Sequence, residues 1–192
     1  MDGESKPKPR PNMFLLKNKE NGDFNQYWYS KDTITFIVTQ IEKHAKNCAF
    51  LSTPSVYFSL KDKDIKNASK VLDFDTKFEK DPNYVFYDFN KPEDLPEDLK
   101  ETFDFWVIDP PFVTDEVWSL YIQAIKFLLV PETGKILLST IDEKEQFLKE
   151  NLGVNRWAFR PSIPNLVYQY SLYTNYEDEA LSEANPEIPD FE

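Results

Sequence analysis

Apolar residues in the middle of this chain occur in two alternating patterns. Short continuous runs are typical of strands buried on both faces of a sheet. Between them, residues 31–46 and 114–129 carry apolar side chains at the spacing of an amphipathic helix. Strands that alternate with helices predict an α/β fold with a doubly wound, mostly parallel sheet. The strand-like runs are residues 48–52, 70–74, 84–87, 103–108 and 135–141.

Smaller signals refine this prediction. Ser30 is a plausible N-cap for the first long helix, and Pro54 is well placed to open a short helix after the first strand. A charged helix is expected over 142–151. Residues 156–159 and 166–174 follow as a pair of strands with no helix between them. Such a pair predicts an antiparallel edge to the sheet.

The two ends of the chain differ from the middle in composition. Residues 1–23 are expected to be a flexible N-terminal arm, and residues 177–192 an acidic C-terminal tail exposed to solvent. A second interpretation of the tail is an electrostatic lure for a basic partner. The remaining residues, 24–176, are predicted to form one domain, since a chain of 192 residues suffices for a single large core.

Composition excludes several kinds of site. Hydrophobic residues make up 41% of the chain and aromatic residues 16%, as in a globular protein. Only four glycines occur, so a glycine-rich loop that cradles phosphates is not expected. One cysteine and one histidine are too few for a disulfide or a structural zinc site. No apolar stretch approaches the ~20 residues of a membrane span, so we expect a cytoplasmic protein.

The formal net charge of −12 bears on the partners. A protein that binds DNA or RNA usually presents a basic face to the phosphates. This charge therefore favours a basic protein or a small molecule as partner and argues against nucleic acid. A local basic patch hidden within the net charge stays open as an alternative.

The tetrapeptide Asp-Pro-Pro-Phe at 109–112 directly follows the most strand-like run. The prolines stiffen the turn, Asp109 supplies a hydrogen-bond acceptor, and the carbonyl of Pro110 supplies another. Phe112 offers a ring face to a cation or a flat group. An amine held in this way has its lone pair directed along one line, as attack on a methyl group requires. The alternative is a proline turn that merely closes a surface strand.

Polar residues also follow the other predicted strands. Ligands of doubly wound sheets bind at the carboxyl ends of the strands. Acids there could bind ribose hydroxyls and an adenine amino group, although each acid alone could equally cap a helix or face solvent. Together, and without a phosphate loop, they suit an adenosine that carries no phosphate, such as S-adenosylmethionine. These residues are Ser52, Thr53, Pro54, Asp73, Asp75, Asp88 and Asp109.

Several motifs occur in a consistent order between residues 24 and 176. They are Gln-Tyr-Trp-Tyr-Ser at 26–30, Ser-Thr-Pro-Ser-Val-Tyr at 52–57, Asp-Phe-Asp at 73–75, Val-Phe-Tyr-Asp at 85–88, the tetrapeptide at 109–112, and the closing segment 161–176. In this order they resemble the eukaryotic elongation factor 1A lysine methyltransferase 1 family, once grouped with adenine-N6 DNA methyltransferases. Thr76 departs from the family, which often has a basic residue at this position. Ser162 and Ile163 depart as well, because His or Arg is common there.

The resemblance implies a Rossmann-like methyltransferase fold with seven strands and an antiparallel closing hairpin. It implies methyl transfer from S-adenosylmethionine to a lysine of elongation factor 1A by a monomeric enzyme without a metal. Asp109 and the Pro110 carbonyl would orient the amine, and Phe112 would line the methyl channel. Trp28 and Tyr29 would join the strand-end residues around the cofactor. Tyr27, Phe112 and Asn165 would contact the substrate.

Each implied role has a plainer alternative. Tyr27, Trp28 and Tyr29 could instead pack the first helix against the sheet, and Asn165 could be a turn residue. Lysine has an ordinary pKa of ~10.4 and must lose a proton before it attacks, yet no dedicated base is evident. Two other functions remain open. One is adenine-N6 methylation of DNA or RNA, with the base flipped onto Phe112. The other is a catalytically silent, cofactor-binding partner module.

Overall fold

Seven strands form one sheet in the order β3-β2-β1-β4-β5-β7-β6 in the computed structural model, which describes residues 10–189. The first five strands along the chain run parallel, and β7 lies antiparallel between β5 and β6. This confirms the predicted doubly wound, mostly parallel sheet with an antiparallel closing pair. The strands are β1 (Cys48–Leu51), β2 (Lys70–Asp73), β3 (Tyr84–Phe86), β4 (Phe105–Ile108), β5 (Lys135–Thr140), β6 (Asn155–Arg156) and β7 (Ser171–Thr174).

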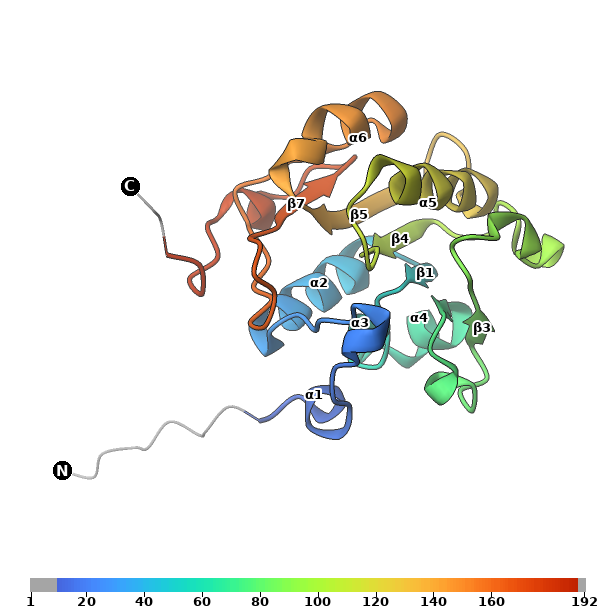
Figure 1. Cartoon of the computed structure of the whole chain (residues 1–192), viewed down its shortest axis with the longest axis horizontal. Coiled ribbons are helices and arrows are strands. Elements are labelled where there is room, and N and C mark those ends of the chain that lie inside the picture. The colour runs from blue at the N-terminus through green and yellow to red at the C-terminus, as the bar shows by residue number, and fades with distance from the viewer. Residues whose placement is uncertain (1–9, 190–192) are drawn as a thin grey trace.

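Helices cover both faces of the sheet (Figure 1). On one face lie α2 (Lys31–His44), α3 (Pro54–Tyr57) and α4 (Lys63–Ala68), and on the other lie α5 (Asp115–Leu128) and α6 (Glu145–Leu152). A short helix, α1 (Met13–Lys17), precedes them. Single 3-10 turns occur at Gly22–Phe24, Thr76–Phe78, Pro92–Asp94, Glu97–Leu99, Asp142–Lys144 and Glu179–Ser182.

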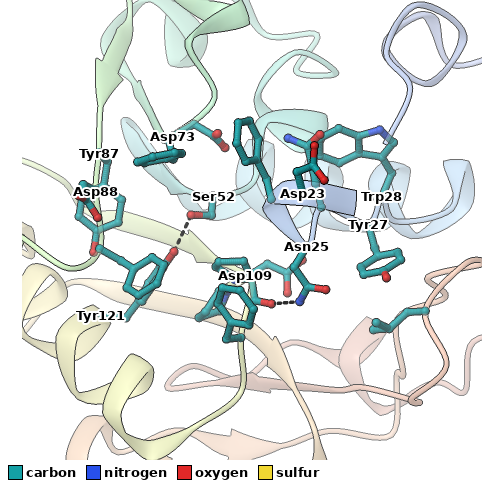
Figure 2. Close-up of a pocket in the computed structure, with 18 of the residues that line it drawn as sticks. Asp23, Asn25, Tyr27, Trp28, Ser52, Asp73, Tyr87, Asp88, Asp109 and Tyr121 are labelled. Atoms are coloured by element: carbon teal, nitrogen blue, oxygen red, sulfur yellow. Dashed lines mark hydrogen bonds between the residues drawn. The ribbon is translucent and has the colours of Figure 1, made fainter. Parts of the chain in front are cut away.

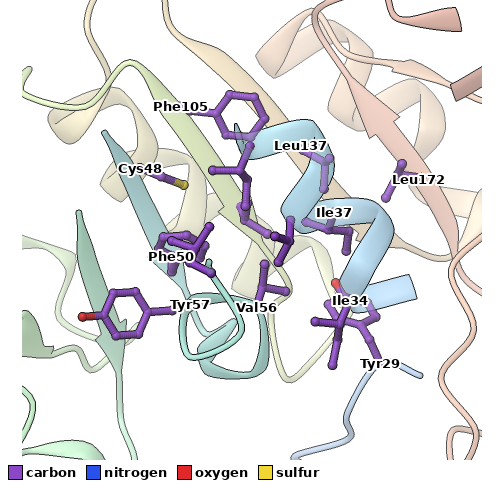
Figure 3. Packing of buried hydrophobic residues seen from close by; sticks show 14 of the residues in the cluster. Tyr29, Ile34, Ile37, Cys48, Phe50, Val56, Tyr57, Phe105, Leu137 and Leu172 are labelled. Atoms are coloured by element: carbon purple, nitrogen blue, oxygen red, sulfur yellow. The ribbon is translucent and has the colours of Figure 1, made fainter. Parts of the chain in front are cut away.

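The alternation of side chains along the strands divides the core in two. Phe50 of β1 and Val107 of β4 pack under α2 in one cluster, which Figure 3 shows in part. Leu51 and Ile108, the next residues along the same strands, belong to the cluster under α5. Successive side chains of a strand point to opposite faces, so strands apolar at every position require helices on both sides.

Helix α2 forms where its pattern predicted it. The Ser30 hydroxyl accepts a hydrogen bond from the backbone N–H of Thr33 at 3.1 Å, which caps the first turn. Ile34, Ile37 and Ile41 are fully buried against the sheet. Each such side chain contributes roughly 1.5–3 kcal/mol through its burial.

The closing pair of strands is shorter than the sequence predicted. Only Asn155–Arg156 pairs with β7, and the chain from residue 157 to 170 is an irregular loop. Pro161 and Pro164 lie within this loop, and proline has no backbone N–H to continue a ladder. The loop therefore leaves the sheet and can lie over the carboxyl ends of the strands.

The described parts of the two flanking segments are packed, unlike the flexible arm and solvated tail that we expected. Phe14 of α1 is 6% exposed and contacts Trp28 edge to face, with ring centroids 5.1 Å apart. Leu181 is fully buried in the cluster under α2. Asp178 accepts hydrogen bonds at 2.6 Å from both Lys43 and His44. Single apolar residues in these otherwise polar segments pack against the domain and hold the segments in place.

The predicted domain limits at 24 and 176 stay a prediction, and residues 1–9 and 190–192 lie outside the described part of the chain. Within residues 10–189, no helix has the length and apolar character needed to cross a membrane.

Candidate active site

A cavity of about 270 Å³ opens at the carboxyl ends of β1, β2 and β4 (Figure 2). It lies between the loops that follow these strands, the segment before α2 and the long loop before β7. Parallel strands present these ends at one edge of the sheet, where ligands of such folds bind. The lining residues are Asp23, Phe24, Asn25, Gln26, Tyr27, Trp28, Ser52, Asp73, Phe74, Tyr87, Asp88, Phe89, Asn90, Asp109, Pro110, Pro111, Phe112, Tyr121, Ile163, Leu166 and Tyr170.

The turn after β1 forms the base of the cavity without a glycine. Ser52 adopts a left-handed backbone conformation with φ of 56°, which usually favours glycine. Its backbone N–H donates to the carbonyl of Leu72 at 2.9 Å, and its hydroxyl contacts the hydroxyl of Tyr121 at 2.7 Å. These bonds tie β1, β2 and α5 together and hold the turn in this conformation.

One end of the cavity is acidic and aromatic. Asp73, at the end of β2, is 6% exposed, and its Oδ1 accepts the backbone N–H of Asp75 at 2.8 Å. Burial raises the pKa of Asp73 to about 7. The hydroxyl of Tyr87 is buried in the cavity wall and has no hydrogen-bond partner within residues 10–189. A buried hydroxyl without a partner is costly, so this end is suited to a ligand with polar groups.

Asp109 lies near the centre of the cavity, directly after β4 (Figure 2). Its backbone N–H donates to the carbonyl of Leu51 at 3.2 Å and so continues the parallel pairing. Its Oδ1 accepts the hydroxyl of Ser139 at 3.2 Å. Burial raises the pKa of Asp109 to about 7, while hydrogen bonds from Ser139 and Tyr29 act in the opposite direction. The carboxyl group therefore changes charge near neutral pH.

The segment before α2 closes the cavity from the other side. Asn25 has a left-handed backbone conformation with φ of 50°, and its side-chain amide donates to the carbonyl of Pro111. Tyr27 lies on the same side of the cavity as Asn25, and Leu166 and Tyr170 of the long loop also line the cavity. These three side chains give the cavity an apolar and aromatic part, beside the polar Asp23 and Asn25.

Aromatic rings continue from the cavity to the protein surface. Phe74 lies 5.6 Å from Phe24 and 5.5 Å from Phe86, measured between ring centroids. Phe112 is 46% exposed and lies 6.2 Å from Phe89. Exposed rings beside a cavity offer faces to a flat group or a cation.

The structure brings most of the sequence-predicted site residues to the cavity. The predicted residues that line it are Tyr27, Trp28, Ser52, Asp73, Asp88, Asp109, Pro110 and Phe112. Their individual roles stay predictions, since position alone does not assign a role.

Five other predicted site residues do not line the cavity. Thr53 donates to the carbonyl of Val107 at 3.3 Å, and Pro54 is the first residue of α3. The carboxylate of Asp75 caps the turn at Thr76–Phe78 and pairs with Lys77 at 2.9 Å.

The remaining two have partners outside the cavity wall. Asn165 donates to the carboxylate of Glu20 at 2.8 Å. Tyr29 is 2% exposed and bonds to Ser139 behind Asp109. All five lie near predicted strand ends or motifs. Four of their side chains bond to other groups of the protein, and Pro54 begins a helix.

Sequence analysis missed several residues of the cavity. Tyr87 directly precedes Asp88 at a predicted strand end, so its position offered a usable signal. Tyr121 lies within the amphipathic helix predicted over 114–129, and that pattern alone does not indicate a cavity. Asn25 and Tyr170 offered no local signal, because both reach the cavity through the path of a loop.

The lining fits a nucleoside-type group better than a phosphate. Acceptors on Asp73 and Asp88 and the unpaired hydroxyl of Tyr87 match a ligand rich in hydroxyl and amino groups. At the turn after β1, the backbone N–H of Ser52 is bonded to Leu72 and Pro54 has no N–H, so the turn differs from a glycine-rich phosphate loop.

Known proteins similar to this chain are named as methyltransferases. Residues 20–178 match the family model described as "Probable N6-adenine methyltransferase". The chain is 34% identical to EEF1A lysine methyltransferase 1 of Danio rerio over 82% of this chain and 99% of that protein. It is 32% identical to EEF1A lysine methyltransferase 1 of Homo sapiens, over 83% and 76%.

Among solved structures, the fold is similar to that of the branched-chain polyamine synthase from Thermus thermophilus, solved with N4-aminopropylspermidine and 5'-methylthioadenosine. The TM-score is 0.62 at 14% identity, over 84% of this chain and 60% of that one. At this identity the likeness concerns the fold alone.

Proposed function

This chain belongs to the EEF1A lysine methyltransferase 1 family, and from this we propose that it methylates a lysine of elongation factor 1A. The observation that carries the proposal is the position of Asp109. Its carboxyl group lines the cavity with Asp73, Tyr87 and Asp88 on one side and Tyr27 on the other (Figure 2). A group placed there can hold an amine directly in front of a bound methyl donor.

The acidic end of the cavity would hold S-adenosylmethionine. Asp73 and Asp88 would accept hydrogen bonds from its hydroxyl and amino groups, and the buried hydroxyl of Tyr87 would gain a partner. Trp28 would add an aromatic face near the positive sulfur. When bound, this cofactor supplies an electrophilic methyl group and leaves as S-adenosylhomocysteine.

The apolar and aromatic part of the cavity would receive the lysine. Tyr27, Leu166 and Tyr170 would contact its alkyl chain and exclude water from the amine. Removal of water lowers the pKa of an ammonium group, because the charged form loses its hydration. The carbonyl of Pro110 and the face of Phe112 would complete the surroundings of the nitrogen.

Asp109 would serve both orientation and proton transfer. Its carboxylate would accept a hydrogen bond from the nitrogen, and its pKa of about 7 makes it a better base than an ordinary carboxylate. The ammonium would lose a proton to this group before a new N–C bond forms. Asp109 is thus our candidate for the proton acceptor that the sequence left open.

Adenine-N6 methylation is the second candidate, favoured by the description of the matching family model. The same carboxylate could hold an exocyclic amine, with the base against Phe112. The net charge of −12 argues against a nucleic-acid substrate. A catalytically silent partner module would have no use for a titratable carboxyl at the centre of the cavity.

We also propose that the protein acts as a monomer in the cytoplasm. Its one cysteine, Cys48, is free and buried, as expected in a reducing compartment. The exposed rings beside the cavity would then face a protein substrate rather than a second copy of the chain.

Methyl-labelled cofactor separates these functions. The protein is incubated with purified elongation factor 1A or with total RNA and DNA. Asp109→Ala is compared with Asp98→Asn, which changes an exposed carboxylate outside the cavity lining. Label on a lysine of the factor, lost in Asp109→Ala and kept in Asp98→Asn, supports the proposal. Label that nuclease removes would support adenine methylation. Cofactor binding without any transfer would support the silent module.

A further inference from the structure

A chain of hydroxyl groups leads from the protein interior to Asp109. The hydroxyl of Tyr29 lies 2.6 Å from Oγ of Ser139, and Ser139 donates to Oδ1 of Asp109 at 3.2 Å. Both distances lie within or near the usual range for oxygen–oxygen hydrogen bonds. These three residues come from three separate segments, so only the folded chain brings them together.

The hydroxyl groups of this series are held in fixed positions because their residues are buried. Ser139 is fully buried on β5, and Tyr29 is 2% exposed immediately before α2. The backbone around Tyr29 is anchored as well, because the N–H of the next residue, Ser30, donates to the carbonyl of Ser162 at 2.8 Å. Hydroxyls in such surroundings must bond to each other or remain unpaired at a cost.

The bond from Ser139 involves one oxygen of the Asp109 side chain. Oδ1 accepts the Ser139 hydroxyl at 3.2 Å, and the hydroxyl of Tyr29 also acts on this carboxyl group and lowers its pKa. The carboxyl group lines the cavity, where a ligand can reach it. A bond that fixes Oδ1 also fixes the plane of the carboxylate and the direction of Oδ2.

We propose that Tyr29 and Ser139 are positioning residues that act through Asp109. They hold Oδ1 so that Oδ2 receives the hydrogen bond, and then the proton, of the target amine. The inference rests on the proposed methyltransferase function and assigns Tyr29 a task other than the cofactor contact that the sequence suggested. Tyr29 supports the carboxylate from behind and does not line the cavity.

The same hydroxyl groups also affect the pKa of Asp109, and so the pH at which it becomes charged. Burial raises its pKa, and the hydroxyls of Ser139 and Tyr29 lower it again because they stabilise the ionised form. The folded-state pKa lies above the ordinary value of 3.8, so Asp109 gains its negative charge only as the pH approaches about 7. Loss of either hydroxyl should move this ionisation to still higher pH.

Removal of single hydroxyls tests the proposal. In Ser139→Ala and Tyr29→Phe, the acidic limb of the pH–rate profile should move upward by about one unit. At pH 7 the rate constant kcat should fall about fivefold, since a smaller share of Asp109 is ionised. The rate should recover toward that of the wild type at pH 9, and cofactor affinity should stay unchanged. A purely structural defect would not recover with pH.

Two matched variants serve as controls. Tyr57→Phe removes a hydroxyl that donates to Asp81 at 2.8 Å, and Ser171→Ala removes one that donates to Asp142. Neither Tyr57 nor Ser171 lines the cavity, so neither change should move the acidic limb.

Carbon-13 NMR titration of the Asp109 carboxyl group provides a readout independent of catalysis. Its pKa should be higher in Ser139→Ala and Tyr29→Phe than in the wild type. Unchanged titration and unchanged pH–rate profiles in well-folded variants would overturn the proposal. If the wild type methylates no lysine, the proposed function fails, and the NMR titration alone decides whether the hydroxyl chain controls Asp109.

Discussion

The side-chain amide of Asn25 donates a hydrogen bond to the backbone carbonyl of Pro111, across 86 positions of the sequence. This contact joins the segment before α2 to the Asp-Pro-Pro-Phe turn. It closes the cavity beside Asp109 (Figure 2). Asn25 can adopt its left-handed backbone conformation because asparagine tolerates positive φ better than most residues.

Loss of the Asn25 amide should loosen the wall of the cavity. In Asn25→Gly the backbone conformation remains accessible, but the bond to Pro111 is absent. We expect KM for the protein substrate to rise several-fold, with stability lowered by only about 1 kcal/mol. Steady-state kinetics and thermal unfolding measure the two effects. Glu101→Gly is the control, since Glu101 also has positive φ, at 53°, and does not line the cavity. An equal rise in KM for both variants would contradict this role of Asn25.

The unpaired hydroxyl of Tyr87 should matter for the cofactor and not for folding. In Tyr87→Phe we expect cofactor affinity to fall about threefold to tenfold, because a bound polar group loses its partner. Stability should stay the same or rise slightly, since a buried hydroxyl without a partner is removed. Calorimetric titration and urea unfolding test this. Tyr57→Phe, which breaks a bond to Asp81, should show the reverse: lower stability and unchanged affinity.

The raised pKa of Asp109 should make the folded protein less stable as pH rises. The folded-state pKa of about 7 lies above the ordinary 3.8, so between these values the folded chain holds a proton that the unfolded chain has lost. The stability contributed by this proton is complete below about pH 4 and is lost as pH rises through 7. Asp109→Asn cannot ionise and should escape this loss.

Thermal unfolding at pH 5 and pH 8 measures the effect. The melting temperature of Asp109→Asn should exceed that of the wild type by a few degrees more at pH 8 than at pH 5, because each kcal/mol corresponds to roughly 2–4 °C in a chain of this size. Asp98→Asn, which changes an exposed carboxylate, should show no such difference. A melting-temperature difference independent of pH would mean that Asp109 ionises at its ordinary pKa.

The segment after residue 176 should contribute to stability, because Leu181 is fully buried beneath α2. Leu181→Ala should lower the free energy of unfolding by about 2–4 kcal/mol through lost burial and the cavity left behind. Glu183→Ala, at an exposed position of the same segment, should change it by less than about 0.5 kcal/mol. Urea unfolding of both variants checks this. Equal, small effects would mean that the segment is a solvated tail after all.

Local patterns predicted the main elements well and their ends less well. Helix α2 begins after Ser30 as expected, because the cap and the apolar stripe both lie within a short stretch of sequence. Helix α4 was missed, since it spans only Lys63–Ala68 and has a single buried residue, Ile65. The described parts of the predicted arm and tail are packed because isolated apolar residues such as Phe14 and Leu181 find partners far along the chain.

The sequence by itself determined the alternation of strands and helices, the position of Asp109 at a strand end, and the resemblance to a methyltransferase family. Each of these depends on periodicity or on contiguous motifs, which neighbouring residues encode directly. Only the tertiary structure decided which side chains share the cavity. In the structure, Asn25, Tyr87 and Tyr170 line the cavity. Tyr29, expected to contact the cofactor, instead bonds to Ser139 and does not line the cavity. Such contacts depend on how distant segments pack against one sheet, and no local pattern records that packing.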